Sequence, residues 1–107
     1  MDESLYLRLA DETFERIQAA LEPLDPDLVD FEFSHDVLQI VFADGARCVI
    51  NTQRPARQLW LAWDRRAWHF DWDESKGQWL DDKGQGVELL SKVREIVKEK
   101  AGAEIAL

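Results

Sequence analysis

Apolar residues recur at helical spacing at both ends of the chain. Near the start they are Tyr6, Ala10, Phe14, Ile17 and Leu21. Near the end they are Leu89, Leu90, Val93, Ile96 and Val97. Steps of three and four residues place each set on one stripe of an amphipathic helix. We therefore predict a helix over residues 5–21, capped by Ser4, and a helix over residues 87–101, ended by Gly102.

Between these helices, apolar and polar residues alternate, as they do in half-buried strands. The alternating runs cover residues 29–33, 38–42, 58–63, 68–72 and 78–80, and one more strand runs from Val49 toward the bend at Pro55. Short connections between neighbouring strands favour antiparallel pairing. We predict an α+β two-layer sandwich, in which both helices pack on one face of a mostly antiparallel sheet of five to six strands.

The Asp-Gly pair at residues 44–45 predicts a hairpin. A three-residue loop with the glycine as a bulge pairs Phe42 with Ala46 and points Cys48 into the core. A two-residue loop would instead put Arg47 on the buried face. We prefer the three-residue loop, and we predict that Cys48 is buried and inert.

Length and composition favour a single domain over residues 1–107. With 46% apolar residues, a chain of 107 residues can bury a stable core without disulfides or a structural metal. One cysteine allows no internal disulfide. Asp2 and Glu3 stand where a signal peptide needs positive charge, and no apolar run is long enough for a membrane span. We expect a cytoplasmic protein without a membrane partner.

Acidic residues are concentrated in the first half of the chain. The net charge is −9, and residues 1–44 contain 12 Asp and Glu side chains but only two bases. This charge repels nucleic acid and anionic membranes, and it attracts cations and basic protein surfaces. Seven of the carboxylates lie side by side if the first helix packs along the first strand: Asp11, Glu15, Glu22, Asp25, Asp27, Asp30 and Glu32. Their oxygens suit Fe²⁺, Fe³⁺, Mn²⁺, Ca²⁺ or Mg²⁺, although the spacing alone favours a solvated acidic face.

No catalytic motif is present: the chain has no nucleophile elbow, phosphate-binding glycine loop, HExxH or CxxC. His35 and His69 are predicted to be surface residues, and a weak pairing of His69 with Asp71 is open. Trp60 alternates with two leucines, so we predict that it is exposed on the open face of the sheet beside Asn51. An exposed tryptophan on a flat sheet is a plausible anchor for a partner.

Several stretches together resemble a known family. Residues 8–17 read RLADETFERI, residues 50–62 read INTQRPARQLWLA, residues 68–72 read WHFDW, and VELL at residues 87–90 follows Trp79. They resemble the frataxin family, in its bacterial CyaY branch, over nearly the whole chain. The pattern N-x-Q-x₄-Q-hydrophobic-W-L is the most specific of these signals, and the order of the predicted elements agrees with the family fold.

The resemblance implies a role in iron–sulfur cluster assembly. Frataxins bind ferrous and ferric iron weakly on an acidic ridge formed by the first helix and the first strand, and they dock on the cysteine desulfurase and on the cluster scaffold protein. By position, the ridge carries over to Asp11, Glu22, Asp25, Asp27, Asp30 and Glu32. The surface that contacts the scaffold carries over to Asn51, Gln53, Gln58 and Trp60.

We therefore expect a non-enzymatic iron-dependent regulator of the desulfurase, an iron donor to the scaffold, or both. A monomer is expected, and oligomerisation driven by iron stays open. The alternative is a ferroxidase or an iron-storage and detoxification protein, which needs a di-iron site of inward carboxylates and histidines that the sequence does not supply. A third hypothesis, an RNA binder that stacks bases on the sheet, is disfavoured by the acidic charge.

Overall fold

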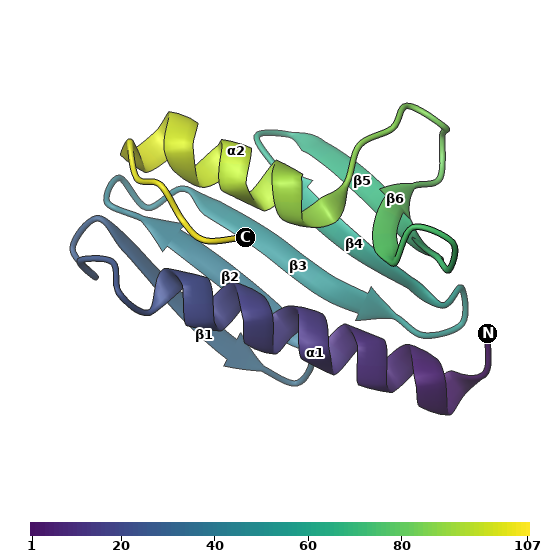
Figure 1. Ribbon diagram of the computed structural model, residues 1–107. Helices are drawn as coiled ribbons and strands as arrows, with labels where there is room; N and C mark the ends of the chain where they lie inside the picture. The colour runs from purple at the N-terminus through teal and green to yellow at the C-terminus, as the bar shows by residue number, and fades with distance from the viewer.

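The chain folds as a helix, six strands and a second helix in the computed structural model, which describes residues 1–107 (Figure 1). The helices are α1 (Glu3–Leu21) and α2 (Leu89–Ala101). The strands are β1 (Val29–Ser34), β2 (Val37–Phe42), β3 (Arg47–Gln53), β4 (Gln58–Trp63), β5 (Arg66–Asp73) and β6 (Gln78–Asp81). Neither helix combines the length and the apolar character that a membrane crossing requires.

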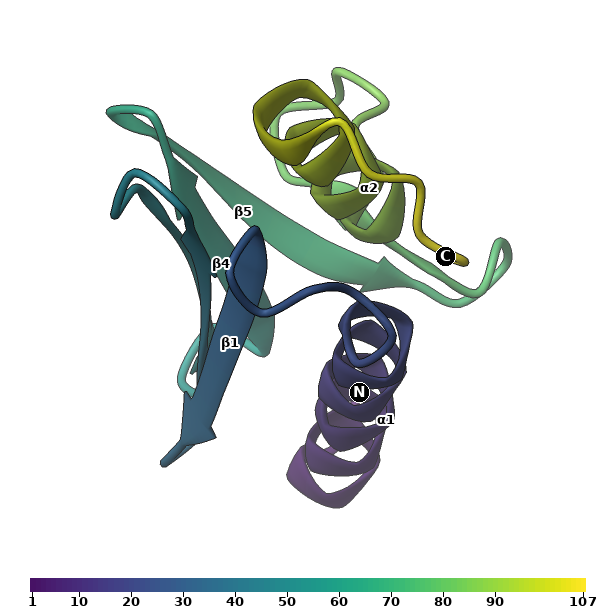
Figure 2. The same ribbon diagram turned by 90° about the vertical axis from the view of Figure 1, so that its left-hand side faces the viewer.

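The six strands form one sheet in which every neighbouring pair is antiparallel and the spatial order is the chain order, β1 to β6. Both helices lie on the same side of this sheet, and its other side is left uncovered (Figure 2). The predicted α+β sandwich is therefore confirmed. Since the connections are short, β1 and β6 form the two edges, and β3 and β4 form the middle of the open face.

The core lies between the helices and the sheet and contains 21 buried apolar residues. All five apolar residues of the predicted α1 stripe belong to it. The predicted hairpin after β2 is confirmed, because the Phe42 N–H donates to the Ala46 carbonyl at 2.9 Å and Gly45 adopts a φ of +87°. Cys48 is fully buried, as predicted, and burial raises the pKa of its thiol to about 12.

Both helices begin at residues that differ from the prediction. At α1 the cap is Asp2 and not Ser4: its carboxylate accepts the Leu5 N–H at 2.8 Å, so the helix begins at Glu3. At α2 the cap is Glu88, whose carboxylate accepts two backbone N–H groups, so the helix begins two residues later than predicted. Gly102 ends α2 in the left-handed region, as predicted.

The edge strand β1 is less buried than its alternation suggests. Val29 is buried, whereas Phe33, at the far end of the same face, is 39% exposed. The Phe33 ring still contacts α1, with its centroid 4.9 Å from that of Phe14. The helix layer therefore reaches β1 at its margin, and the carboxylates of α1 and β1 come near the same edge of the molecule.

Candidate functional site

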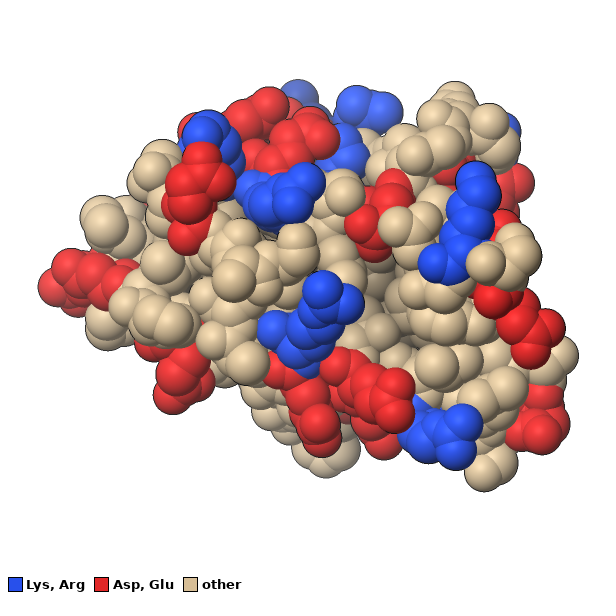
Figure 3. Space-filling view, viewed as in Figure 1, with Lys and Arg blue, Asp and Glu red and all other residues tan.

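The seven predicted metal ligands are all exposed, and they surround the β1 edge of the molecule. We call them the acidic flank: Asp11 and Glu15 of α1, Glu22 at its C-terminal cap, Asp25 and Asp27 of the following turn, and Asp30 and Glu32 of β1. Figure 3 shows the helix side, where acidic atoms gather over α1 and over the turn that follows it. The structure thus places every predicted ligand on one edge.

The acidic flank is divided between two layers. Phe14 of α1 faces β1, whereas Thr13 faces β6 through its hydrogen bond with Trp79. Helical spacing places Asp11, Glu15 and the C-cap Glu22 on the side of the helix beyond Phe14, which is the β1 side. Asp30 and Glu32 alternate with the inward-facing residues of β1 and therefore point to the open face of the sheet. Consequently no three His, Cys, Asp or Glu side chains lie close enough to hold one metal ion together.

The carboxylates of the acidic flank have no cationic partner. The six ion pairs of the structure use other acidic residues, and none of the seven takes part. Two of the seven accept local backbone hydrogen bonds: Asp25 from the Asp27 N–H at 2.9 Å and Asp30 from the Phe31 N–H at 2.8 Å. Oxygen donors of this kind fit a hard cation. Their separation fits weak surface binding of that cation.

The four predicted partner-binding residues share the open face of the sheet. Asn51 lies opposite Trp60, and Gln53 lies opposite Gln58, across the β3–β4 pair. We call these four residues the sheet surface. All four are half-buried, so the prediction that Trp60 is exposed is wrong in degree. The reason is His69 of β5, which lies opposite Trp60 and stacks on its indole with ring centroids 4.1 Å apart at 13°.

Gln58 connects the sheet surface to two carboxylates. Its Oε1 accepts the indole N–H of Trp60 at 2.9 Å, and its Nε2 donates to Asp71 and to Asp82 at 3.1 Å each. The ionic partner of His69 is Asp82, with Nδ1 and Oδ2 3.7 Å apart, and not Asp71 as the sequence suggested. Asp82 follows β6, and only the folding of that loop brings it to the open face. No signal in the sequence could have identified it.

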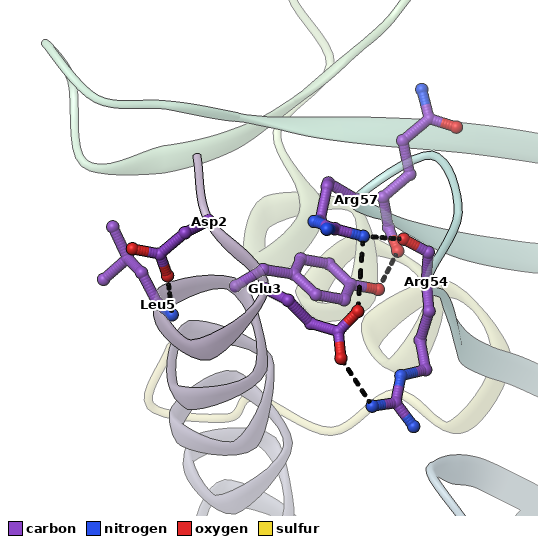
Figure 4. A network of polar contacts seen from close by, with 7 residues as sticks. Asp2, Glu3, Leu5, Arg54 and Arg57 are labelled. Carbon is purple, nitrogen blue, oxygen red and sulfur yellow. Dashed lines mark hydrogen bonds and ion pairs between the residues drawn. The ribbon is translucent and has the colours of Figure 1, made fainter.

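A second network fixes α1 to the turn between β3 and β4, next to the sheet surface (Figure 4). The Glu3 carboxylate lies 3.1 Å from the guanidinium of Arg54 and 3.7 Å from that of Arg57. Arg57 also donates to the Arg54 carbonyl at 2.7 Å. In the same region the Tyr6 hydroxyl donates to the Gln58 carbonyl at 2.7 Å. These contacts hold Gln58, and with it the sheet surface, against the N-terminal half of α1.

Sequence comparison decides the family. Residues 1–103 match the model of the frataxin-like domain. The chain belongs to the frataxin family. It is 36% identical to the iron–sulfur cluster assembly protein CyaY of Pseudomonas fluorescens, over 97% of this chain and 93% of that protein. It is 37% identical to the CyaY protein of Dechloromonas aromatica, over 100% of this chain and 99% of that protein.

Solved structures of other frataxins share this fold. The frataxin of Psychromonas ingrahamii matches with a TM-score of 0.87 and 27% identity, over 98% of this chain and 96% of that one. The trimeric frataxin of the yeast Saccharomyces cerevisiae, described as complexed with ferrous iron, matches with a TM-score of 0.75 and 29% identity, over 89% and 87% of the two chains. The arrangement of two helices on one six-stranded sheet is therefore that of a frataxin.

Proposed function

We propose that this frataxin is an iron-binding protein of iron–sulfur cluster assembly, without a catalytic reaction of its own. It acts as an iron-dependent regulator of the cysteine desulfurase, as an iron donor to the scaffold protein, or as both. The observation that carries this proposal is the set of seven exposed carboxylates without a cationic partner, in a chain similar over its whole length to proteins named for this assembly. The bacterial relatives support the cytoplasm as its place of action.

In this proposal the acidic flank and the sheet surface have different binding roles. The acidic flank attracts iron through oxygen ligands and attracts a basic patch on the desulfurase through its charge. The sheet surface, with Trp60 at its centre, contacts the scaffold. Both surfaces reach the open face, because Asp30 and Glu32 of β1 point to the same side of the sheet as Trp60, and β2 separates β1 from the sheet surface. A protein bound to one surface is therefore close to a protein bound to the other.

A charge-reversal experiment tests the acidic flank. Glu22→Lys, Asp27→Lys and Glu32→Lys reverse three carboxylates that accept no hydrogen bond in the structure, so the turn and β1 keep their backbone contacts. The control reverses three exposed acids of the second half, Glu74→Lys, Glu95→Lys and Glu99→Lys. Because the attraction is electrostatic, we expect the first variant to lose at least tenfold in affinity for the desulfurase, about 1.4 kcal/mol, and the control to lose less. Equal affinities of wild type and both variants would contradict this role.

A desulfurase assay tests the dependence on iron. Sulfide production is measured with the host's desulfurase and scaffold, with and without Fe²⁺, for wild type, the charge-reversal variant and Trp60→Ala. We expect a change in rate that requires Fe²⁺ and the acidic flank, and a scaffold-dependent part that Trp60→Ala removes. Iron oxidation is followed in parallel and should be no faster than in buffer. Accelerated oxidation without an effect on the desulfurase would favour the ferroxidase alternative.

A further inference from the structure

His69 is the feature of the open face that the proposed function leaves unused. Its imidazole covers one face of the Trp60 indole, with ring centroids 4.1 Å apart at 13°. On its other side, Nδ1 lies 3.7 Å from the Asp82 carboxylate. The position of Asp82 is fixed as well, because its backbone N–H donates to the His69 carbonyl at 2.8 Å. His69 therefore lies between an aromatic face and an anion.

The orientation of the Gln58 amide follows from its partners. Two carboxylates, Asp71 and Asp82, can only accept hydrogen bonds, and the Trp60 indole N–H can only donate. The amide must therefore turn its NH₂ toward the carboxylates and its oxygen toward the indole, as the contacts show. Two contacts thus fix the Trp60 indole: its N–H donates to Gln58, and its ring stacks on His69. Of these two contacts, only that of His69 involves a side chain that exists in both a neutral and a cationic form.

Charged groups of both signs surround the imidazole. Asp82 faces it directly, and Asp71 lies two residues along β5 on the same face. A cavity of about 280 Å³ beside His69 is also lined by Arg66, Asp81 and Lys83. On the neighbouring strand β4, the residues opposite His69 and Asp71 are the uncharged Trp60 and Gln58. In the same rows of β3, beyond β4, lie Asn51 and Gln53, which are also uncharged. A protonated ring gains the attraction of Asp82 and a cation–π contact with the indole, whereas a neutral ring keeps only the stacking.

We propose that His69 is a positioning residue for Trp60, whose imidazolium form holds the indole in place more firmly than its neutral form does. Partner binding through Trp60 is then tighter when the imidazole carries the second proton than when it is neutral. This inference rests on the proposed contact of the sheet surface with the scaffold. A cation–π contact at a partly exposed site predicts an affinity about two- to fivefold higher with the protonated ring than with the neutral ring.

The first test observes Trp60 without any partner. In protein labelled with 5-fluorotryptophan, ¹⁹F NMR gives one resonance per tryptophan, and Trp60→Phe identifies that of Trp60. We expect this resonance to follow a one-proton titration between pH 8 and 6 in wild type and to stay constant in His69→Gln. The matched control is His35→Gln, which removes the other histidine, an exposed one, and should leave the titration unchanged. A constant Trp60 resonance in wild type, or an equal shift in His69→Gln, overturns the inference.

The second test measures scaffold affinity at pH 6 and pH 8. The ratio of the two affinities in wild type is compared with that in His69→Gln, because the comparison removes any pH response of the scaffold itself. His69→Arg keeps a planar cation on the indole at both pH values, so it should bind well at both. Equal ratios in wild type and His69→Gln overturn the inference while the scaffold contact stands. Absence of scaffold binding at both pH values overturns the proposed contact instead, and the NMR titration still decides the role of His69.

Discussion

The indole N–H of Trp79 is a donor buried in the core, and one hydroxyl satisfies it. Thr13 Oγ1 accepts this N–H at 2.9 Å and donates its own proton to the Leu9 carbonyl at 2.8 Å. Thr13 is the single buried polar residue of the chain. Because α1 and β6 belong to opposite layers, this contact fixes the position of the helix over the sheet more specifically than apolar packing does.

Thr13→Val should therefore destabilise the protein although it keeps the volume of the side chain. The variant leaves the Trp79 N–H buried without an acceptor, which costs about 1–3 kcal/mol in the free energy of unfolding. Urea denaturation of wild type and variant measures this loss. Thr13→Ser, which keeps the hydroxyl, is the control and should lose less. A Thr13→Val variant as stable as wild type would show that the buried indole finds another partner.

Cys48 should be unreactive in the folded protein. Its thiol is fully buried, and burial raises its pKa to about 12, so almost no thiolate exists at pH 8. A disulfide reagent at pH 8 should modify it only after denaturant is added. The raised pKa also sets a pH dependence: the stabilising contribution of the protonated thiol is complete below about pH 9 and is lost as the pH rises toward 12. Rapid modification of the native protein would contradict this placement.

At the scale of single residues, the sequence predicts which face a side chain occupies better than what it touches. Loop length and alternation were enough to place Cys48 in the core. Alternation also placed Trp60 on the open face, but it could not reveal the half-burial. That depends on the register between β4 and β5, which sets His69 opposite Trp60. The contact of Asp82 with His69 depends on the path of the loop after β6, and a loop has no periodic pattern of apolar residues from which its path could be predicted.

At the scale of elements, the connection from β6 to α2 is organised around one carboxylate. Asp81 accepts the backbone N–H groups of Lys83, Gln85 and Val87 at 3.3, 3.1 and 2.8 Å. Its own N–H donates to the Val87 carbonyl at 2.9 Å. Val87 is therefore engaged by β6 and cannot begin α2, which explains why a helix predicted from residue 87 begins at Leu89. Apolar spacing marks a helix face, whereas competing side-chain acceptors decide its first residue.

Asp81→Ala should loosen this connection without unfolding the sheet. We expect the amide protons of Gln85 and Val87 to exchange faster with solvent, as hydrogen exchange followed by NMR measures residue by residue. Burial opposes ionisation of Asp81, but the three amide donors outweigh it and hold the pKa of the carboxyl below its ordinary value of 3.8. The loop is therefore stabilised above that value and loses this contribution as the pH falls through the lowered pKa. Asp82→Ala, one residue on, is the control and should leave both amides protected.

At the scale of the whole molecule, the sequence predicted the charge asymmetry and the structure shows how it is distributed. The acidic flank follows one edge and continues over two layers, so its members repel one another without converging on one point. Alternation along residues 29–33 already implies that Asp30 and Glu32 face away from the helices. Linear spacing does not say where α1 lies over the sheet, so it could not show how far the carboxylates of α1 stand from those of β1. The bases of the second half are used elsewhere, several of them in ion pairs.

This unbalanced charge predicts that salt stabilises the fold. At about 0.01 M ionic strength the screening length is about 30 Å, comparable with the molecular dimensions of 39 × 27 × 23 Å, so all the flank carboxylates repel one another. At about 0.1 M it falls to about 10 Å and the repulsion weakens. We expect Tm, measured by circular dichroism, to rise by several degrees between these conditions, since roughly 1 kcal/mol corresponds to about 4–8 °C in a domain of this size.

Two variants of equal charge change separate this repulsion from a general effect of salt. Asp11→Asn, Glu15→Gln and Glu32→Gln remove three carboxylates that have no partner, so this variant should be more stable than wild type at low salt and respond less to added salt. Glu3→Gln, Glu95→Gln and Glu104→Gln remove three carboxylates that are paired with Arg54, Lys92 and Lys98. This second variant loses attractions along with repulsion and should gain less or become less stable. If both variants respond to salt as wild type does, repulsion within the acidic flank is not what limits the stability of this fold.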